Sequence, residues 1–308
     1  MNLKLKKIGL LFNPQNTSKS WVTHAMAPTS FVQDDIIRVF VGGWDESGIS
    51  RIYEINLNKL KPTEIINIKK EPILDIGFKG CFDENGVFPG HISIDEDKIY
   101  LSYTGFQLGH KIPHYNFSGL LKLINNIFIK TSNSPLLDRH DEGLYVRAGH
   151  SFIKEGPFYH SVYSSGSTFE MVGGKLRPNY NVFYKKTSSL EKSDFASAGK
   201  KIIEFDQDEH GLGRPQIFKL NNIYFVIYTV RTKDMNYSIG ISYSKNLKDW
   251  TRYYWDIEQF KTLNEFDSEM IYFPFFQQIG DNWGYIFYSG NEFGKFGLGA
   301  IKLEIKND

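Results

Sequence analysis

Apolar and polar positions along this chain follow one pattern that recurs about every 60 residues. In each repeat, a short polar segment ends at an anchor residue. The anchors are Pro28, Pro89, His150, Pro215 and Pro274. An apolar run rich in aromatic and β-branched residues follows each anchor after about 10 to 15 positions, and most repeats add a second such run. Runs of this composition are typical of β-strands, so each repeat predicts a small antiparallel sheet.

A regular succession of such sheets predicts an all-β fold, in which the sheets stand around a common axis. We expect a five-bladed β-propeller with four-stranded antiparallel blades, forming a single domain over residues 1–308. The segment Leu3 to Leu11 is the natural partner of the last blade and would close the ring. Only Ser188 to Lys200 has the composition of a short helix, and a loop is an equal alternative there.

In a propeller of this kind, residues just before each anchor face the central funnel. The first of these polar segments runs from Trp21 to Pro28 and contains His24, which either lines the funnel or is a buried histidine bonded to backbone. His150 occupies an anchor position itself and is a second candidate for binding a ligand.

Carboxylates are concentrated before two of the anchors. Asp83 lies in an otherwise apolar approach to Pro89, beside Glu84 and Asn85, and a simple turn-forming role is the alternative. Asn85 would hold a ligand hydroxyl or cap the turn. Asp267 and Glu269 are two residues apart, so in an extended segment they share a face, and both are expected to look into the channel.

Two arginines precede anchors at equivalent places, Arg147 and Arg214. Arg214 would either bridge neighbouring blades by pairing with an acid or bind a ligand, and Arg147 stands where the other repeats put their funnel residues. The planar guanidinium fork matches a carboxylate or phosphate group. Together they predict a locally positive funnel and an anionic ligand.

Composition limits the remaining possibilities. The formal net charge of +1 argues against nonspecific binding of nucleic acid. The single cysteine, Cys81, cannot form an intrachain disulfide, and no apolar run approaches the length of a membrane span. The sequence also has no motif for a metal or cofactor. We therefore expect a soluble, cytoplasmic protein.

Several segments together resemble the superfamily of five-bladed propeller glycosidases, which takes in arabinanases and xylosidases, invertases and levansucrases, and mannoside phosphorylases. The resemblance spans the whole chain. It rests on Phe82-Asp83-Glu84-Asn85-Gly86-Val87, Gly213-Arg214-Pro215, Ser244-Lys-Asn-Leu-Lys-Asp-Trp250 and Asp267-Ser268-Glu269-Met270. Those hydrolases often carry an Asp before Pro in the first blade, where this chain has Asn13-Pro14.

The resemblance implies a carbohydrate ligand and assigns roles. Glu269 would be the proton donor, Asp83 the base or nucleophile, and Asp267 a group holding sugar hydroxyls. His24, Asn85, Arg147, His150, Arg214, Tyr288 and Asn291 would bind substrate. Three alternatives remain: a glycoside hydrolase or transglycosylase, a phosphorylase or transferase that uses phosphate or a sugar nucleotide, and a noncatalytic sugar-binding protein. Asn13 favours the last of these.

Overall fold

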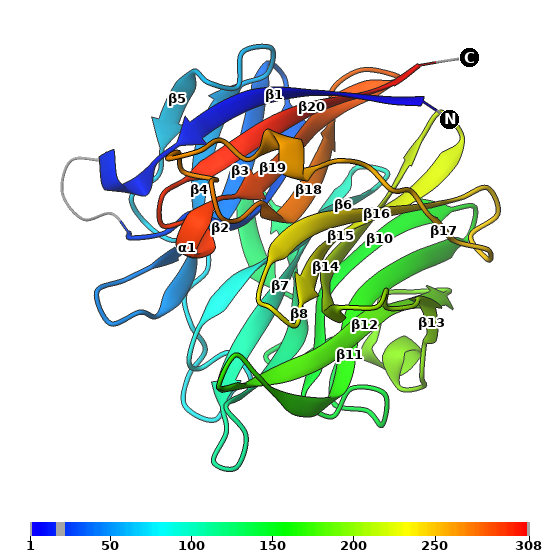
Figure 1. Cartoon of the computed structure of the whole chain (residues 1–308). Helices are drawn as coiled ribbons and strands as arrows, with labels where there is room; N and C mark the ends of the chain where they lie inside the picture. The colour runs from blue at the N-terminus through cyan, green and yellow to red at the C-terminus, as the bar shows by residue number, and fades with distance from the viewer. Residues whose placement is uncertain (1, 17–21, 307–308) are drawn as a thin grey trace.

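The computed structural model describes residues 2–16 and 22–306, and this part of the chain is almost entirely β-structure (Figure 1). Trp21, where the first polar segment was predicted to begin, lies outside the described residues. The helical turns are short: η1 (Pro14–Asn16), η2 (Lys192–Phe195), η3 (Glu258–Phe260) and α1 (Asn291–Gly294). Within residues 2–16 and 22–306, no helix has the length and hydropathy needed to cross a membrane.

The strands pair in antiparallel groups that follow one another along the chain. The first group contains β2 (Met26–Gln33), β3 (Ile36–Trp44), β4 (Ser50–Asn58) and β5 (Ile65–Ile68). The second contains β6 (Val87–Asp95), β7 (Lys98–Leu108), β8 (His114–Ile124) and β9 (Ile127–Lys130). The third contains β10 (Val146–Glu155), β11 (Phe158–Val172), β12 (Lys175–Thr187) and β13 (Lys200–Ile203). The fourth contains β14 (Glu209–Leu220), β15 (Ile223–Thr232), β16 (Tyr237–Ser244) and β17 (Thr251–Arg252). Short parallel pairings of β8 with β10 and of β12 with β14 join the second, third and fourth groups into one 12-stranded sheet.

The last group joins the two ends of the chain. It contains β18 (Tyr272–Gln278), β19 (Trp283–Ser289), β20 (Leu298–Lys306) and β1 (Asn2–Phe12). β1 pairs antiparallel with β20 from Asn2 opposite Lys306 to Phe12 opposite Leu298, and Figure 1 shows these two strands side by side. The prediction that the N-terminal segment completes the last sheet is confirmed.

Side chains on the first strand of each group link neighbouring groups, in a circuit that returns to its start. Hydroxyl and amide side chains make these links, because few or no backbone hydrogen bonds join one first strand directly to the next. The links are Thr29 to the Ile92 amide at 2.7 Å, Ser93 to the Phe152 amide at 3.1 Å, Ser151 to the Ile217 amide at 3.2 Å, Gln216 to the Phe276 amide at 2.6 Å, and Ser30 to Gln277 at 2.8 Å. β2, β6, β10, β14 and β18 therefore surround a common centre.

The anchor residues lie inside these first strands, next to a shift in register. The shifts fall at Met26/Thr29, Pro89/Ile92, Ala148/Ser151, Gly213/Gln216 and Tyr272/Phe275. Each of the other four anchors lies one residue before the second position of its shift. In β6 that place belongs to His91 rather than to Pro89, so the second anchor was predicted two residues too early. Such bulges kink a strand and re-aim its side chains.

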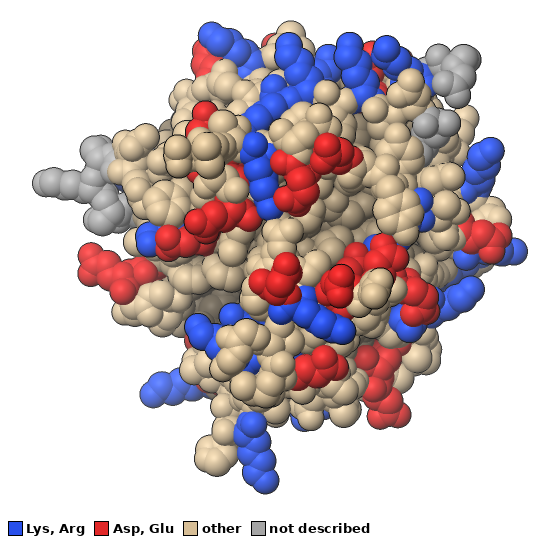
Figure 2. Space-filling view, in the orientation of Figure 1, with Lys and Arg blue, Asp and Glu red and all other residues tan. Residues whose placement is uncertain are grey.

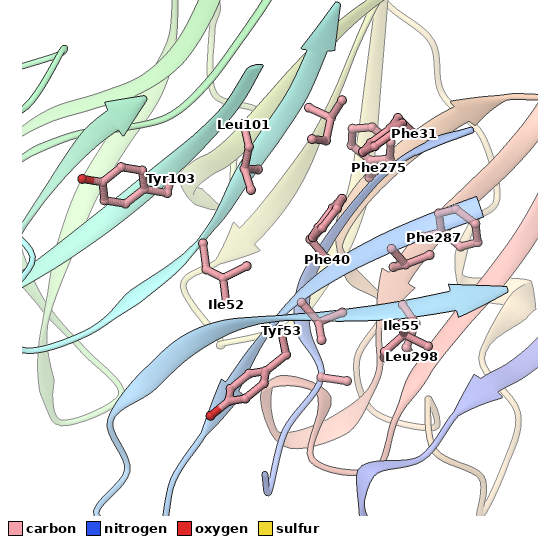
Figure 3. Packing of buried hydrophobic residues seen from close by; sticks show 14 of the residues in the cluster. Phe31, Phe40, Ile52, Tyr53, Ile55, Leu101, Tyr103, Phe275, Phe287 and Leu298 are labelled. Atoms are coloured by element: carbon pink, nitrogen blue, oxygen red, sulfur yellow. The ribbon is translucent and has the colours of Figure 1, made fainter. Parts of the chain in front are cut away.

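The core lies between the faces of neighbouring groups. Figure 3 shows part of one cluster, in which Phe40 of β3, Ile52 of β4, Leu101 of β7 and Phe275 of β18 pack together, all buried. Burying a side chain of this size contributes about 1.5 to 3 kcal/mol each. On the outside, acidic and basic side chains are interspersed over the face shown in Figure 2, with basic groups gathered along β1.

Candidate functional site

A cavity of about 400 Å³ lies where the first strands converge. Its wall takes residues from every strand group, including Met26 and Trp44 from the first, Phe88 and Thr104 from the second, and Gly149 and Arg177 from the third. Arg214 and Arg231 come from the fourth group and Phe273 from the last. The volume falls within the range of small-molecule binding pockets.

Arg214 forms the centre of the cavity floor. Its guanidinium donates hydrogen bonds to carbonyl oxygens of three other first strands: Ala27 and Pro28 of β2 at 2.9 and 2.7 Å, Pro89 and Gly90 of β6 at 3.1 and 2.5 Å, and Phe273 and Pro274 of β18 at 3.3 and 3.2 Å. Burial lowers the pKa of the Arg214 guanidinium well below its usual range. Because a guanidinium nevertheless stays protonated in proteins, this buried charge is held by backbone dipoles rather than by a carboxylate.

The backbone around Arg214 takes an uncommon conformation. Ala27, Arg214 and Phe273 have φ values of 54°, 49° and 52°, in the left-handed region. Gly149 shares this conformation with a φ of 69°, and a Cβ atom there would lie 2.7 Å from the Arg214 Cα, so only glycine allows β10 to approach so closely. Positive φ at residues other than glycine concentrates at functional sites.

Two further arginines, Arg177 and Arg231, form a cationic wall beside His114. Arg231 is 4% exposed and donates through Nη2 to His210 Nδ1 at 2.9 Å and to the Pro178 carbonyl. Within residues 2–16 and 22–306, the Arg177 side chain has no hydrogen bond or ion pair, and its buried Nε is unpaired. Burial and the charges of Arg177 and Arg231 lower the pKa of His114 to about 4. None of the described residues lining the cavity is Asp or Glu.

The carboxylate of Glu170 lies beside the cationic wall, since Glu170 stands opposite Arg177 in the β11–β12 ladder and contacts His210. Because Arg231 donates to Nδ1, the neutral imidazole carries its proton on Nε2, which faces Glu170 Oε2 at 3.4 Å. Glu170 is half exposed, at the extended β11–β12 hairpin. Burial, together with the charge of Arg231, lowers the pKa of His210. This chain of contacts fixes one end of the Arg231 guanidinium.

Five buried polar atoms of the cavity wall have no hydrogen-bond partner among the described residues. They are Trp44 Nε1, Ser50 Oγ, Thr104 Oγ1, Arg177 Nε and Arg231 Nε. Buried polar atoms are rarely unpaired in folded proteins. Their concentration at one cavity indicates that a ligand or water completes these bonds.

Aromatic rings cover the side of the cavity formed by the first and last groups. The Trp44 and Phe293 rings stack at 6.4 Å between centroids, and Phe88 stacks on Phe273 at the same separation. Flat apolar surfaces of this kind suit the apolar face of a sugar ring or a planar base.

Of the site residues predicted from the sequence, Asn85 and Arg214 line the cavity. The Asn85 Oδ1 atom accepts the Leu108 amide at 2.9 Å, so this side chain also fixes the β7–β8 turn. Arg214 does not bridge blades through an acid, because its donors all reach carbonyl oxygens.

Asp83 and Asp267 lie away from the cavity in matching surroundings, contrary to the expectation that they face the channel. Asp83 Oδ2 accepts from the Tyr103 hydroxyl at 3.1 Å and lies 2.6 Å from Lys130 Nζ. Its other oxygen packs against Gly77, where a Cβ atom would lie 2.0 Å away. Asp267 Oδ2 has the same pair of contacts, with Tyr288 at 2.7 Å and Lys7 at 2.7 Å. Tyr288 is therefore occupied by Asp267.

Arg147, His150 and His24 also point elsewhere. Arg147, which was expected to bind the ligand, donates to the carbonyls of Asp138 and Phe195 at 2.7 and 3.2 Å and lies 3.2 Å from Glu142. His150 Nε2 lies 3.0 Å from Ser161 Oγ, and burial with the nearby Arg147 charge lowers its pKa to about 3. His24 stacks behind Trp44, with ring centroids 4.0 Å apart.

Glu269 and Asn291 border a separate surface groove. Glu269 is exposed, and the Asn291 Oδ1 accepts the backbone amides of Glu269 and Met270 at 2.8 and 3.0 Å. The structure thus does not bring Asp83, Asp267 and Glu269 together at the cavity. Their catalytic roles stay predictions.

The cationic wall was not predicted from the sequence. Arg231 lies two residues after Thr229, which lines the cavity. Because side chains alternate between the two faces of a strand, Arg231 lies on the same side as Thr229. Arg177 had no comparable signal, because it depends on the length of the β11–β12 hairpin. Among the described residues, no group of three or more His, Cys, Asp and Glu is placed to hold a metal ion.

Comparison with known proteins identifies the fold. No protein-family model matches the chain. An uncharacterised protein of Mycobacterium tuberculosis, Rv1502, is 25% identical over 305 residues, which cover 97% of this chain and 99% of that protein.

Solved structures similar to this chain include glycoside hydrolases of propeller-type families. A glycoside hydrolase has a TM-score of 0.70 at 14% identity, covering 98% of this chain and 92% of its own. An α-L-arabinofuranosidase from Lactobacillus brevis has a TM-score of 0.64 at 9% identity, covering 96% and 95%. A member of the GH130 family of mannoside phosphorylases has a TM-score of 0.61 at 13% identity, covering 91% and 84%. The fold is therefore that of the propeller-type glycosidases.

Proposed function

We propose that this chain is a carbohydrate-active five-bladed propeller whose central cavity binds an anionic sugar. The blade number is supported by the circuit of side-chain links through β2, β6, β10, β14 and β18. The fold shared with glycoside hydrolases supports a carbohydrate ligand.

The observation that carries this proposal is the charge of the cavity wall. Arg177, Arg214 and Arg231 line it, and none of the described lining residues is acidic. Taking cations out of water is costly unless an opposite charge or strong hydrogen bonds compensate. Arg214 is compensated by carbonyls, whereas Arg177 and the free edge of Arg231 are available to a ligand anion.

The same geometry disfavours hydrolysis by a carboxylate pair. That reaction needs two carboxyl groups facing each other across the sugar ring. Asp83 and Asp267 are each held by a tyrosine and a lysine, and Glu269 borders a different groove. The cationic wall agrees better with a protein that binds an anionic sugar, or with one that transfers a sugar to or from phosphate.

Calorimetric titration of the intact chain with matched sugars tests the proposal. We expect anionic sugars to bind more tightly than their neutral parents, with a preference that weakens as salt is raised. Arg231→Gln should reduce this preference, whereas Arg139→Gln, which changes an exposed arginine outside the cavity, should not. Equal binding of neutral and anionic sugars would contradict an anionic ligand.

Turnover assays on the same sugars test the catalytic residues. Asp83→Asn and Glu269→Gln variants that fold and keep full activity would exclude the roles of base and proton donor. A folded Asp83→Asn variant that binds sugar but has lost turnover would instead support hydrolysis.

A further inference from the structure

The unpaired polar atoms of the cavity fall into two sets at different parts of the wall. One set is neutral: Trp44 Nε1, Ser50 Oγ and Thr104 Oγ1. Trp44 and Ser50 are cross-strand partners, and Thr104 is paired with Phe88. Phe88 in turn packs beside Gly42, where a Cβ would lie 3.0 Å from Phe88 Cβ and 3.1 Å from Ser50 Oγ. The three groups therefore share one part of the wall, formed by the first and second strand groups.

The other set is cationic, Arg177 and Arg231 on the third and fourth strand groups. Arg231 bonds to the carbonyl of Pro178, the residue after Arg177. Arg177 and Arg231 both line the cavity, and both charges act on the His114 imidazole, which also lines it. The backbone contact at Pro178 therefore puts the two cations on one stretch of the wall.

The free donors of these arginines suit a group with several oxygens and more than one charge. Arg231 Nη2 is already used by His210 and Pro178, and Tyr237 also hydrogen-bonds this guanidinium, whereas Arg231 Nε is unpaired among the described residues. The whole Arg177 fork is without a partner among the described residues. Glu170 stands opposite Arg177 in the β11–β12 ladder, but among the described residues its ion-pair contact is with His210 and not with Arg177. A ligand carboxylate, with a single charge, would therefore leave one of the two guanidinium groups without an ion-pair partner. A phosphate ester carries about −1.5 to −2 charges at pH 7 and offers three acceptor oxygens.

We propose that the cavity binds a phosphorylated sugar, with its phosphate between Arg177 and Arg231 and its ring hydroxyls at Trp44, Ser50 and Thr104. This inference rests on the proposed function and adds the ligand's anionic group and its orientation. Phe273 and Phe293 supply apolar surface for the ring. The phosphate is either a monoester of the sugar, with three terminal oxygens on one phosphorus atom, or the diphosphate of a sugar nucleotide, which spreads two negative charges over two phosphorus atoms.

Calorimetry on the intact chain tests the anion. The first arm uses inorganic phosphate and a panel of hexose and pentose phosphates. Each sugar phosphate is compared with its neutral sugar and, where one exists, with its uronate. Nucleoside-diphosphate sugars form a second arm. We expect sugar phosphates to bind about 10- to 100-fold more tightly than neutral sugars, the gain typical of charge-assisted hydrogen bonds. Uronates should fall between the two. Tighter binding in one arm identifies the source of the phosphate.

Two variants separate the subsites. Arg177→Gln should remove most of the preference for phosphate and leave the affinity for neutral sugars unchanged. Thr104→Val, which keeps the side-chain shape, should weaken sugars and sugar phosphates alike and leave inorganic phosphate binding unchanged. Because Arg177 has no bond to lose within the described structure, its variant should melt at the wild-type temperature.

The outcomes distinguish the two proposals. Uronates that bind as tightly as sugar phosphates, or an Arg177→Gln variant with an unchanged phosphate preference, would overturn the phosphate site and leave the anionic-sugar proposal standing. If no sugar in the panel binds, charged or neutral, the carbohydrate function is wrong and the phosphate site falls with it.

Discussion

Lys7 Nζ lies 2.7 Å from Asp267 Oδ2, so the first strand of the chain supplies the cation that compensates a buried acid of the last sheet. The same contact recurs in the second strand group, where Lys130 of the outermost strand β9 lies 2.6 Å from Asp83. In both, a tyrosine of the middle strands donates to the carboxylate. Each of these two strand groups therefore has the same set of contacts. An acid that precedes the first strand bonds to a tyrosine of a middle strand and to a lysine of the outermost strand, and this connects the inner and outer edges of the sheet.

We expect Asp83→Asn to lower the free energy of unfolding by about 3 kcal/mol, because breaking a buried ion pair leaves its partner uncompensated. Urea denaturation measures this change. The neighbouring Glu84→Gln is the matched control, since Glu84 is only partly buried and caps a turn, and its effect should stay within about 1 kcal/mol. An Asp83→Asn variant as stable as the wild type would refute the structural role.

Removing the central guanidinium should have a larger effect. Arg214→Met would leave buried carbonyls of β2, β6 and β18 without donors, and we expect a loss of about 4 kcal/mol or more in unfolding free energy. Arg214→Lys keeps the charge but cannot reach all three strands, so its loss should be intermediate. Arg139→Gln serves as the neutral reference. Equal stability of all three variants would show that the floor is held by other contacts.

Buried histidines should make the fold sensitive to mild acid. Burial lowers the pKa of His24 to about 4 and of His150 to about 3, and holds that of His91 well below its usual range. These rings stay neutral in the folded chain but take up protons below about pH 6.5 when unfolded. The contribution of these histidines to the free energy of unfolding is therefore fully present above about pH 6.5. It falls as the pH drops toward 4, by about 1.4 kcal/mol per pH unit for each such histidine.

Urea denaturation between pH 7.5 and 5.0 measures this slope in a range where carboxylates change little. His150→Gln should reduce it relative to the wild type, whatever its effect on stability at neutral pH. An unchanged slope in this variant would mean that His150 does not titrate differently in the two states.

Phosphate binding should raise the pKa of His114 from its value of about 4. The ring lies against Phe106 and Phe169, and the charged groups acting on it are Arg177 and Arg231. An anion between these arginines offsets their charge and favours the protonated imidazole. NMR titration of the His114 ring, with and without inorganic phosphate at matched ionic strength, measures the shift. A constant pKa in protein that binds phosphate would place the anion elsewhere.

The repeating pattern predicted the strands well, because alternation and β-branched runs depend on local sequence. It also placed β1 correctly in the last sheet. Which way a turn acid faces is decided by distant partners, and nothing near Asp83 in the sequence indicates Lys130. The recurring Tyr-Ser/Thr pairs carried a signal that was not used. Tyr103, Tyr163 and Tyr288 each donate to an acid, while Thr104, Ser164 and Thr229 line the cavity.

The position of Arg214 also ties the strand groups to one another. From β14, its guanidinium bonds to carbonyls of β2, β6 and β18, so one side chain holds four of the five first strands. Any relative movement of these strands must therefore break or stretch bonds at the wall of the cavity. Occupation of the cavity and the cohesion of the ring of strands are coupled through this one residue.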